Sequence, residues 1–259
     1  DSKNGLEFFH IGDDNDLKIQ IKDLDILATY SITENVFSNK SDKLKWIHFG
    51  VAGIEQSLFP SILKSKTIIT NASGVHASPV SEFTMGMILY LSKQFGGCEV
   101  YKNSGDWTQW ELARKTIQLK GKIVGIIGFG DIGKAIAKKA KAFDMKVIAT
   151  RRLQKKIEKK KIVDELIPLS NLDYLLAESD YVVIACPLTP LTMGMIGGNE
   201  LAKMKSSAFI INIARGAIID ESALINSLQQ KQITGAGLDV FSAEPLDKDN
   251  QLFKLDNVF

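Results

Sequence analysis

The sequence has few of the residues that mark metal-bound, disulfide-stapled or membrane-spanning proteins. Only two cysteines occur among 259 residues, and Cys98 and Cys186 lie too far apart for a metal-binding spacing, so we predict no metal site. This sparse use of cysteine favours a reducing, cytoplasmic setting. No apolar run has the length of a transmembrane helix and no signal peptide is visible, so we expect no membrane partner.

A strong excess of charge of one sign is also missing. The formal net charge is +2 and the pI is about 8.4, which is too mild to predict nucleic acid as a partner. Lys155–Lys161 (KKIEKKK) is a local exception, and it is interpreted as a solvated helix face rather than a nucleic-acid patch. Apolar residues make up 45% of the chain, enough for a sizeable core in one large or two modest domains.

Short apolar runs rich in β-branched residues alternate with longer helical patterns. This alternation predicts an α/β fold with a largely parallel sheet. The first group of expected strands is Leu6–Ile11, Asp25–Tyr30, Lys45–Phe49 and Thr67–Thr70. The second group is more apolar, as is typical of strands covered on both faces; it comprises Lys122–Ile127, Lys146–Thr150, Tyr181–Ala185, Ala208–Ile213 and Gly235–Asp239.

The segment between the two strand groups bears on oligomeric state. Residues 79–95 start with Pro79 and are apolar nearly all round, which predicts a helix buried between domains or subunits. Gly96–Trp110 is expected to be irregular, because it holds glycines, Asn, Ser and two tryptophans. A dimer-clasping arm and a plain surface loop both fit this segment, and together the two features suggest a homodimer.

The most informative stretch runs from Lys122 to Arg152. Gly128, Gly130 and Gly133 form GxGxxG between an expected strand and an expected helix that begins near Asp131. Gly128 permits the tight exit from the strand, Gly130 lets a pyrophosphate approach the backbone, and Gly133 allows close packing of the helix. The amides of Asp131 and Ile132 then face the phosphates at the positive end of the helix.

This context predicts a dinucleotide site, whereas a lone glycine motif is only a weak signal. The competing interpretation is a glycine-rich turn without a ligand. The end of the second strand bears on which cofactor is bound, because a site selective for NAD carries Asp or Glu there. This chain has Arg151 and Arg152 instead. A guanidinium can bind a 2′-phosphate, so NADP(H) is favoured and NAD(H) remains possible, unless both arginines are merely solvated.

Downstream motifs carry a family resemblance. They are YVVIACPLT at Tyr181–Thr189, NIARG at Asn212–Gly216 and GLDVFSAEP at Gly237–Pro245, after LKGKIVGIIGFGDIG upstream. From about Ile47 onward the chain resembles the D-isomer-specific 2-hydroxyacid dehydrogenases, which include glyoxylate/hydroxypyruvate reductases and phosphoglycerate dehydrogenases. The resemblance implies a Rossmann-type doubly wound domain at 75–259 and a smaller, incomplete flavodoxin-like substrate domain at 1–74.

The resemblance also implies roles for particular residues. Arg215 is similar to the family's catalytic arginine, which holds the substrate carboxylate, and Glu244 to the acidic partner of its histidine. The amides of Ala52 and Gly53 match those that receive the substrate carboxylate. The positions that resemble cofactor contacts are Cys186, Pro187, Ile213, Ala214 and Asp239. The substrate is then expected in the cleft between the domains.

The family's proton-donating histidine follows the AEP segment, and none of His10, His48 and His76 stands there. His48 is expected in the core and His76 near a hinge. Because the chain opens on Asp1 and stops at Phe259 in what reads as a new strand, we treat it as trimmed and expect the histidine beyond Phe259. The favoured function is reduction of a small 2-keto acid such as glyoxylate, hydroxypyruvate or pyruvate. The alternative is a non-catalytic dinucleotide-sensing or corepressor-like binding protein on the same scaffold.

Overall fold

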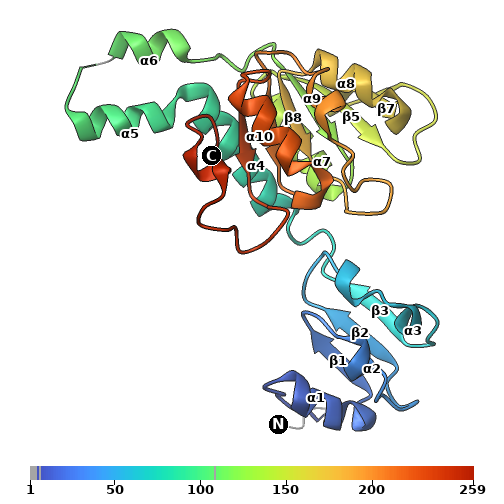
Figure 1. Ribbon diagram of the computed structural model, residues 1–259. Helices are drawn as coiled ribbons and strands as arrows, with labels where there is room; N and C mark the ends of the chain where they lie inside the picture. The colour runs from blue at the N-terminus through green and yellow to red at the C-terminus, as the bar shows by residue number, and fades with distance from the viewer. Residues whose placement is uncertain (1–4, 6, 108) are drawn as a thin grey trace. The chain divides into compact units, whose positions relative to one another are not determined.

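The computed structural model describes residue 5, residues 7–107 and residues 109–259. The chain divides into two compact units, Asp1–Val75 (unit 1) and His76–Phe259 (unit 2). Each unit has its own parallel sheet and its own hydrophobic core (Figure 1). Among the residues described, no helix has both the length and the apolar character needed to cross a membrane.

Unit 1 is a three-stranded parallel sheet with the order β1-β2-β3. Its strands are β1 (Ile26–Thr29), β2 (Trp46–Phe49) and β3 (Ile68–Asn71). Its helices are α1 (Asp14–Gln20), α2 (Glu34–Phe37) and α3 (Pro60–Leu63), with 3₁₀ turns η1 (Ile21–Asp23) and η2 (Glu55–Ser57). Leu27, Ile47 and Phe49 are buried on one face of the sheet, so the core of this unit lies on that face.

The strand expected at Leu6–Ile11 is wrong. Residue 6 lies outside the described residues, and residues 7–11 belong to no strand. Phe8 and Phe9 are 70% and 60% exposed. High β-propensity forms a strand only where a neighbouring strand supplies the ladder and a packed face. Here the chain instead turns into α1, where the Asp13 carboxylate accepts hydrogen bonds from the amides of Asn15 and Asp16.

The expectation that His48 belongs to the core is also wrong. Its side chain lies on the open face of the unit 1 sheet and is only half-buried. The Thr70 hydroxyl sits between two neighbours there: it accepts from Trp46 Nε1 at 2.7 Å and lies 2.9 Å from His48 Nδ1. Strand alternation puts His48 opposite the buried Ile47 and Phe49, and the sequence pattern did not reveal which face would be covered.

Unit 2 is built on a seven-stranded sheet with the order β10-β9-β8-β4-β5-β7-β6. Its strands are β4 (Ile123–Ile127), β5 (Lys146–Arg151), β6 (Glu158–Lys160), β7 (Val163–Pro168), β8 (Tyr181–Ile184), β9 (Phe209–Asn212) and β10 (Gly235–Leu238). All neighbours are parallel except β6 and β7. The chain winds outward from β4 in one direction and then from β8 in the other, so the strand order reverses between β4 and β8.

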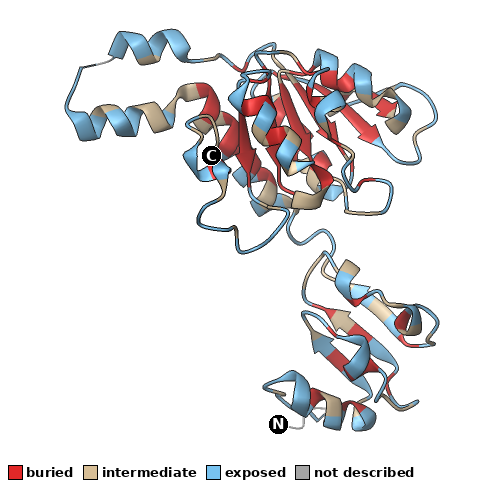
Figure 2. Ribbon diagram, viewed as in Figure 1, coloured by how far each residue is buried: buried red, intermediate tan, exposed pale blue. Residues whose placement is uncertain are grey.

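Helices cover both faces of this sheet. One face carries α4 (Ala77–Lys93) and α7 (Asp131–Ala142). The other carries α8 (Leu172–Glu178), α9 (Gly198–Leu201) and α10 (Glu221–Gln229), with 3₁₀ turns η3 (Leu169–Asn171), η4 (Gly216–Ile218) and η5 (Gln251–Lys254) in the loops. The strands are buried between the two helical layers (Figure 2). The predicted doubly wound α/β fold is therefore confirmed.

The sequence did not predict strands β6 and β7, and the helix face expected at Lys155–Lys161 is wrong. Glu158–Lys160 forms the antiparallel edge strand β6, which pairs with β7. Lysines are well tolerated on an edge strand, because they hinder pairing with another chain. In β7 the Asp164 carboxylate accepts from the Val147 amide at 2.7 Å and from Lys141 at 2.9 Å. Those two bonds stabilise an acidic residue that β-propensity alone disfavours.

The segment expected to be irregular, Gly96–Trp110, is mostly helical. It contains α5 (Phe95–Ser104) and the start of α6 (Gln109–Lys115), and residue 108 lies outside the described residues. A Cβ on Gly96 would lie 2.6 Å from Tyr90 Oη, and one on Gly97 would lie 2.5 Å from Leu112 Cδ2. These glycines therefore serve close packing within a helical arm that extends from the sheet of unit 2 (Figure 1).

The last residues of the chain run beside β10. The sequence pattern predicted the start of a strand here but not its neighbour. Val258 forms a parallel bridge with Ala236, and the Phe259 amide donates to the Ala236 carbonyl at 2.9 Å. The Phe259 ring stacks on Tyr90 of α4 with a centroid distance of 4.0 Å.

Candidate functional site

The predicted site residues of unit 2 follow one another along a single edge of the sheet. Gly128 follows β4, Arg151 ends β5, Cys186 follows β8, Ile213 follows β9 and Asp239 follows β10. Because these strands are parallel, their carboxyl ends share one edge, and that edge is where open α/β sheets bind ligands.

Two glycines of the turn after β4 are required by the packing of the protein itself. Gly128 has φ +108, and a Cβ there would lie 2.7 Å from both the Ala185 carbonyl oxygen and the Cys186 amide nitrogen. A Cβ on Gly133 would lie 2.1 Å from the Gly128 carbonyl oxygen. The turn thus contacts the end of β8 on one side and the first turn of α7 on the other.

Gly130 differs from these two glycines. It is exposed, and a Cβ built on it would meet no atom within 4 Å. It is also the N-cap of α7, and no side chain caps that helix. The first-turn amides, including those of Asp131 and Ile132, are therefore open to an anion at the positive end of the helix. This open cradle fits the pyrophosphate of a dinucleotide, because the glycine leaves the space that such a ligand would fill.

Arg151 and Arg152 lie beside this turn at the end of β5. The Gly128 amide donates to Thr150 Oγ1 at 3.3 Å, which ties the turn to the strand end that carries the arginines. Both arginines are exposed, and neither forms an ion pair with any carboxylate in the part of the chain that the structure describes. Thr150 carried no signal in the sequence beyond its place in the strand.

Cys186 and Pro187 begin the loop after β8. Burial raises the pKa of the Cys186 thiol to about 11, so the thiol stays protonated at neutral pH and is a poor nucleophile. The buried Thr192 fixes the loop, since its hydroxyl donates to the Pro187 carbonyl and accepts from the Thr189 amide, both at 2.8 Å. The sequence analysis did not single out Thr192.

The NIARG turn after β9 is shaped by Asn212, which is 1% exposed. Its amide nitrogen donates to the Arg215 carbonyl at 2.9 Å, and its side-chain oxygen accepts from the Ala214 amide at 3.1 Å. Ile213 is buried and Arg215 is exposed. The Arg215 guanidinium donates to the Ala214 carbonyl at 2.7 Å through Nη1. The buried asparagine therefore sets the conformation of the turn that presents the arginine.

The loop that carries Glu244 packs directly on this turn. A Cβ on Gly216 would lie 1.8 Å from the Phe241 carbonyl carbon and 2.3 Å from the Ser242 nitrogen. Glu244 in turn accepts a hydrogen bond from the Phe241 amide at 3.0 Å. Gly216 thus lets the backbone next to Arg215 touch the backbone that holds Glu244. The sequence offered a signal for this contact, the glycine of NIARG, but not its partner.

Glu221, in the first turn of α10, fastens the same loop. Its Oε2 accepts from the Ser242 hydroxyl at 2.6 Å and the Ser242 amide at 3.2 Å, and its Oε1 accepts from Asn250 Nδ2 at 2.9 Å. Burial raises the pKa of this carboxyl, but the hydrogen bonds from Ser242 and Asn250 outweigh burial and leave the pKa lowered. No motif in the sequence pointed to Glu221.

Asp239 follows β10, and the negative charge of Glu244 repels its carboxylate. Its amide donates to the Asn212 carbonyl at 3.0 Å, which links the ends of β9 and β10. Burial, and then repulsion from Glu244, raise the pKa of the Asp239 carboxyl. The ends of β9 and β10 therefore bring Asp239, Glu244 and the NIARG turn into one neighbourhood.

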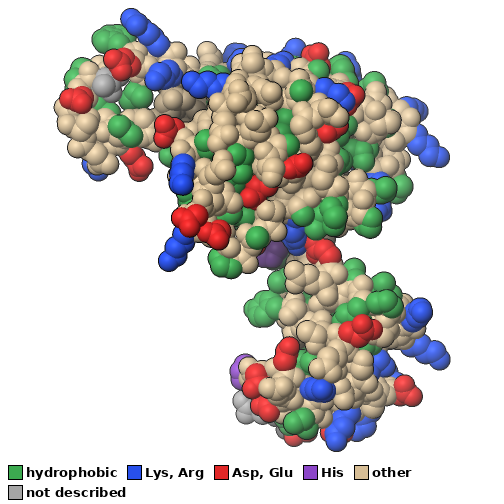
Figure 3. All heavy atoms as spheres, viewed as in Figure 1, with side chains coloured by type: hydrophobic (Ala, Val, Ile, Leu, Met, Phe, Trp, Pro, Cys, Tyr) green, Lys and Arg blue, Asp and Glu red, His purple; other side chains and the backbone are tan. Residues whose placement is uncertain are grey.

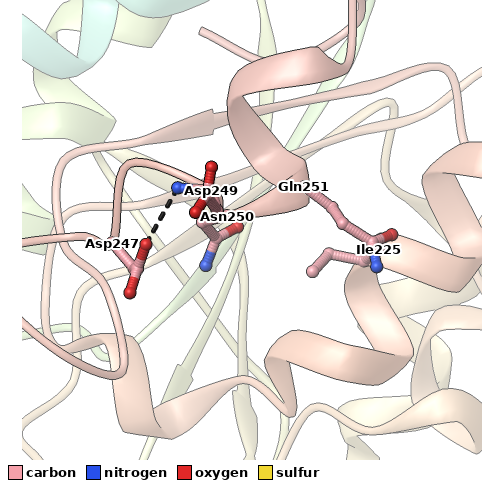
Figure 4. A pocket seen from close by; sticks show the side chains of 5 residues that line it. All are labelled: Ile225, Asp247, Asp249, Asn250 and Gln251. Atoms are coloured by element: carbon pink, nitrogen blue, oxygen red, sulfur yellow. Dashed lines mark hydrogen bonds between the residues drawn. The ribbon is translucent and has the colours of Figure 1, made fainter.

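A hollow lies in another part of unit 2, and its lining does not suit an anionic ligand. It measures about 380 Å³ and is lined by Ile225, Asp247, Asp249, Asn250 and Gln251. Figure 4 shows the Asp249 amide donating to the Asp247 carboxylate, at 2.8 Å. Two carboxylates would repel a dinucleotide or a keto acid. Within the described residues, no group of three or more His, Cys, Asp or Glu side chains forms a metal cluster.

In unit 1, Ala52 and Gly53 lie in the loop after β2. Asn71, the last residue of β3, donates to the Ala52 carbonyl at 2.6 Å, and the Ala72 amide donates to the Val51 carbonyl at 3.1 Å. These bonds hold the loop against the end of β3. His10 and His76 are both exposed, and His76 forms no capping hydrogen bond at the start of α4.

Comparisons with known proteins agree with this geometry. Residues 85–259 match the model of the D-isomer specific 2-hydroxyacid dehydrogenase NAD binding domain. A glyoxylate reductase of Thermococcus litoralis is 35% identical over 247 residues, which span 92% of this chain and 73% of that protein. A D-3-phosphoglycerate dehydrogenase of Methanocaldococcus jannaschii is 36% identical over 242 residues, covering 92% of this chain and 45% of that protein.

Solved structures point the same way. A D-isomer specific 2-hydroxyacid dehydrogenase family protein from Aeromonas salmonicida superposes with a TM-score of 0.85 and 26% identity, covering 99% of this chain and 80% of that one. The matched segment begins within α4 and takes in the whole sheet of unit 2 and the loops at its carboxyl edge. The chain therefore belongs to the D-isomer specific 2-hydroxyacid dehydrogenase family.

Proposed function

We propose that this protein reduces a small 2-keto acid to a D-2-hydroxy acid with NADPH. The observation that carries the proposal is the packing of the Arg215 turn on the Glu244 loop at Gly216, on the same sheet edge as the open glycine turn. Glyoxylate reductases among the relatives support glyoxylate as one substrate, with hydroxypyruvate and pyruvate as chemically related alternatives.

The cofactor is proposed to lie along the carboxyl edge of the unit 2 sheet. Gly130 and the amides of Asp131 and Ile132 would hold the pyrophosphate, and Arg151 and Arg152 would bind the 2′-phosphate of NADPH. The loops that begin at Cys186, Ile213 and Asp239 would flank the nicotinamide half. When bound, this cofactor supplies the hydride.

Binding the substrate carboxylate requires hydrogen-bond donors, either cationic side chains or backbone amides. Arg215 offers a fork of donors that can bind a carboxylate and polarise the adjacent carbonyl. In unit 1, we assign the backbone amides of Ala52 and Gly53 the binding of a carboxylate, because neither donates a hydrogen bond within the described residues. Glu244 is proposed to orient a proton-donating histidine and to favour its charged form; none of the three histidines of this sequence occupies the family's motif position.

Arg215 variants test this function. We expect the full-length protein to oxidise NADPH when glyoxylate, hydroxypyruvate or pyruvate is added, and Arg215→Gln to lower kcat/KM at least about a hundredfold. Arg215→Lys keeps the charge but not the fork, so we expect an intermediate loss. Circular dichroism should show unchanged folding, since Arg215 is exposed.

An Arg215→Gln variant as active as the parent would contradict the role of Arg215. Tight cofactor binding with no turnover of any short 2-keto acid would instead support a non-catalytic dinucleotide-sensing protein.

A homodimer is the oligomeric state we propose. The arm formed by α5 and α6 carries large apolar side chains in solvent: Val100, Trp107 and Trp110 are 69%, 77% and 70% exposed. Exposed tryptophans of this kind are enriched in protein–protein interfaces. A second copy of the chain is therefore proposed to cover the arm.

A further inference from the structure

The lysine-rich segment after Arg152 is divided between two edges of the unit 2 sheet. Glu158 pairs with Leu166, and Lys160 pairs with Val163 at the start of β7. Because β6 is antiparallel to β7, residues before Glu158 lie toward the carboxyl end of β7. Lys155 and Lys156, which we call the outer lysine pair, therefore lie on the side of the sheet where the parallel strands end.

The outer lysine pair is tied to the strand end that carries Arg151. The Gln154 amide donates to the Arg151 carbonyl at 3.0 Å, and the Gln154 side chain donates to the Lys156 carbonyl at 2.7 Å. These two bonds fold the loop back on the end of β5. Arg151 is also in register with Pro168, the last residue of β7, so the loop crosses the carboxyl ends of both strands.

This loop carries a strong excess of positive charge. Residues 151–161 contain seven basic side chains and a single acidic one, Glu158. Among the described residues, Glu158 forms one ion pair, with Lys160 at 3.5 Å. Lys155 and Lys156 are exposed and form no ion pair within the described chain. Lys and Arg side chains are visible at the edge of unit 2 beside β7 (Figure 3). A multiply charged anion held by Arg151 and Arg152 would lie close to this uncompensated positive charge.

The same loop exposes apolar surface among its charges. Leu153 is 77% exposed and Ile157 is 55% exposed. Two large exposed aliphatic side chains are not expected in a segment that is only a solvated charge run. They could contact the flat apolar base that a nucleotide carries next to its phosphorylated ribose. The combination of cations and aliphatic side chains fits the 2′-phosphoadenosine end of NADPH better than it fits a simple inorganic anion.

We infer that Lys155 and Lys156 complete the 2′-phosphate site that Arg151 and Arg152 begin, and so act as further determinants of cofactor choice. The inference rests on the proposed function, because it takes NADPH as the ligand. The lysines of this segment then fall into two groups with different roles. The outer lysine pair faces the cofactor edge, while Lys159 and Lys161 lie toward the opposite edge of the hairpin.

This division supplies a matched control. NADPH and NADH are titrated against cofactor fluorescence for the parent, for Lys155→Ala/Lys156→Ala and for Lys159→Ala/Lys161→Ala. Each double variant loses two exposed lysines that form no ion pair with any described residue, so both change the net charge equally. Arg151→Asp is included as the variant that removes the first part of the site.

We expect Lys155→Ala/Lys156→Ala to raise the NADPH Kd about three- to tenfold, as two exposed charge interactions would. Its NADH Kd should change less than about twofold, because NADH lacks the 2′-phosphate. The control pair should change either Kd less than about twofold, and the NADPH preference of the parent should shrink with added salt.

Equal effects of the two double variants on NADPH would overturn the inference while leaving the proposed function intact. A parent that prefers NADH, with Arg151→Asp unchanged, would overturn both the arginine assignment and the lysine pair. A parent that binds neither dinucleotide would defeat the proposed function itself.

Discussion

A methyl group added at Gly133 would lie 2.1 Å from the Gly128 carbonyl oxygen, whereas one added at Gly130 would meet no atom within 4 Å. The same motif thus contains a glycine that the fold requires and a glycine that only a ligand would require. The sequence motif alone assigns both to one site and does not separate the two effects.

Two alanine substitutions separate them. Gly133→Ala should lower the free energy of unfolding by about 1–3 kcal/mol, because the backbone must move to admit the methyl group. Gly130→Ala should change it by no more than about 1 kcal/mol but should weaken NADPH binding at least about tenfold. Thermal unfolding and a cofactor titration measure the two effects. Unchanged NADPH affinity in Gly130→Ala would contradict the placement of the pyrophosphate.

Other residues of the site could not be predicted from the sequence. Thr192 and Glu221 act through hydrogen bonds to partners that lie 3 to 29 residues away in the chain, and no motif in the sequence marks those partners. Arg215 and Glu244 were named from the family resemblance, because an exposed side chain in a loop has no periodicity to identify it. The glycines were different, since their place between a strand and a helix is visible in the sequence.

At the scale of elements, α10 and the loop after β10 are joined by the Glu221 carboxylate. Its pKa is lowered in the folded protein, so it contributes stability that is present above the unfolded pKa and is lost as pH falls through the folded pKa. The relevant range lies below the ordinary value of 4.5.

Glu221→Gln therefore makes a pH-dependent prediction. At neutral pH it should lower the free energy of unfolding by about 1–2 kcal/mol, because the amide cannot accept all three bonds from Ser242 and Asn250. The difference from the parent should shrink as the pH falls below the ordinary carboxyl pKa of 4.5. Urea titrations at several pH values measure it, with the exposed Glu178→Gln as control. A pH-independent difference would show that the carboxylate charge is not what holds the loop.

The sequence predicted the central strands and the edge strand β10, but it missed β6 and β7 at the other end of the sheet. β4, β5, β8 and β9 are apolar enough to read as buried on both faces, and the structure places them in the middle of the sheet. β6 and β7 at the edge carry lysines and carboxylates, which periodicity cannot distinguish from a charged helix. The sequence also failed to predict helix α5. Gly96 and Gly97 suggest a loop, and only the structure shows that these glycines lie in close contact with Tyr90 and Leu112.

At the scale of the whole molecule, the proposed dimer depends on the α5–α6 arm. Trp107→Ser/Trp110→Ser should convert a dimer into a monomer, because the apolar area that the partner would cover is removed. Light scattering after size-exclusion chromatography measures the mass. Phe253→Ser, at a residue that is 66% exposed outside the arm, should leave the dimer intact. A monomeric parent, or a double variant that remains dimeric, would contradict the proposal.

The chemistry that we propose beside the dinucleotide turn is the reduction of a 2-keto acid to its D-2-hydroxy acid. The most direct measurement is chiral analysis of the glycerate formed from hydroxypyruvate and NADPH by the full-length protein. We predict D-glycerate in a one-to-one ratio with the NADPH consumed. Formation of L-glycerate, or no consumption of NADPH with hydroxypyruvate, glyoxylate or pyruvate, would contradict the account.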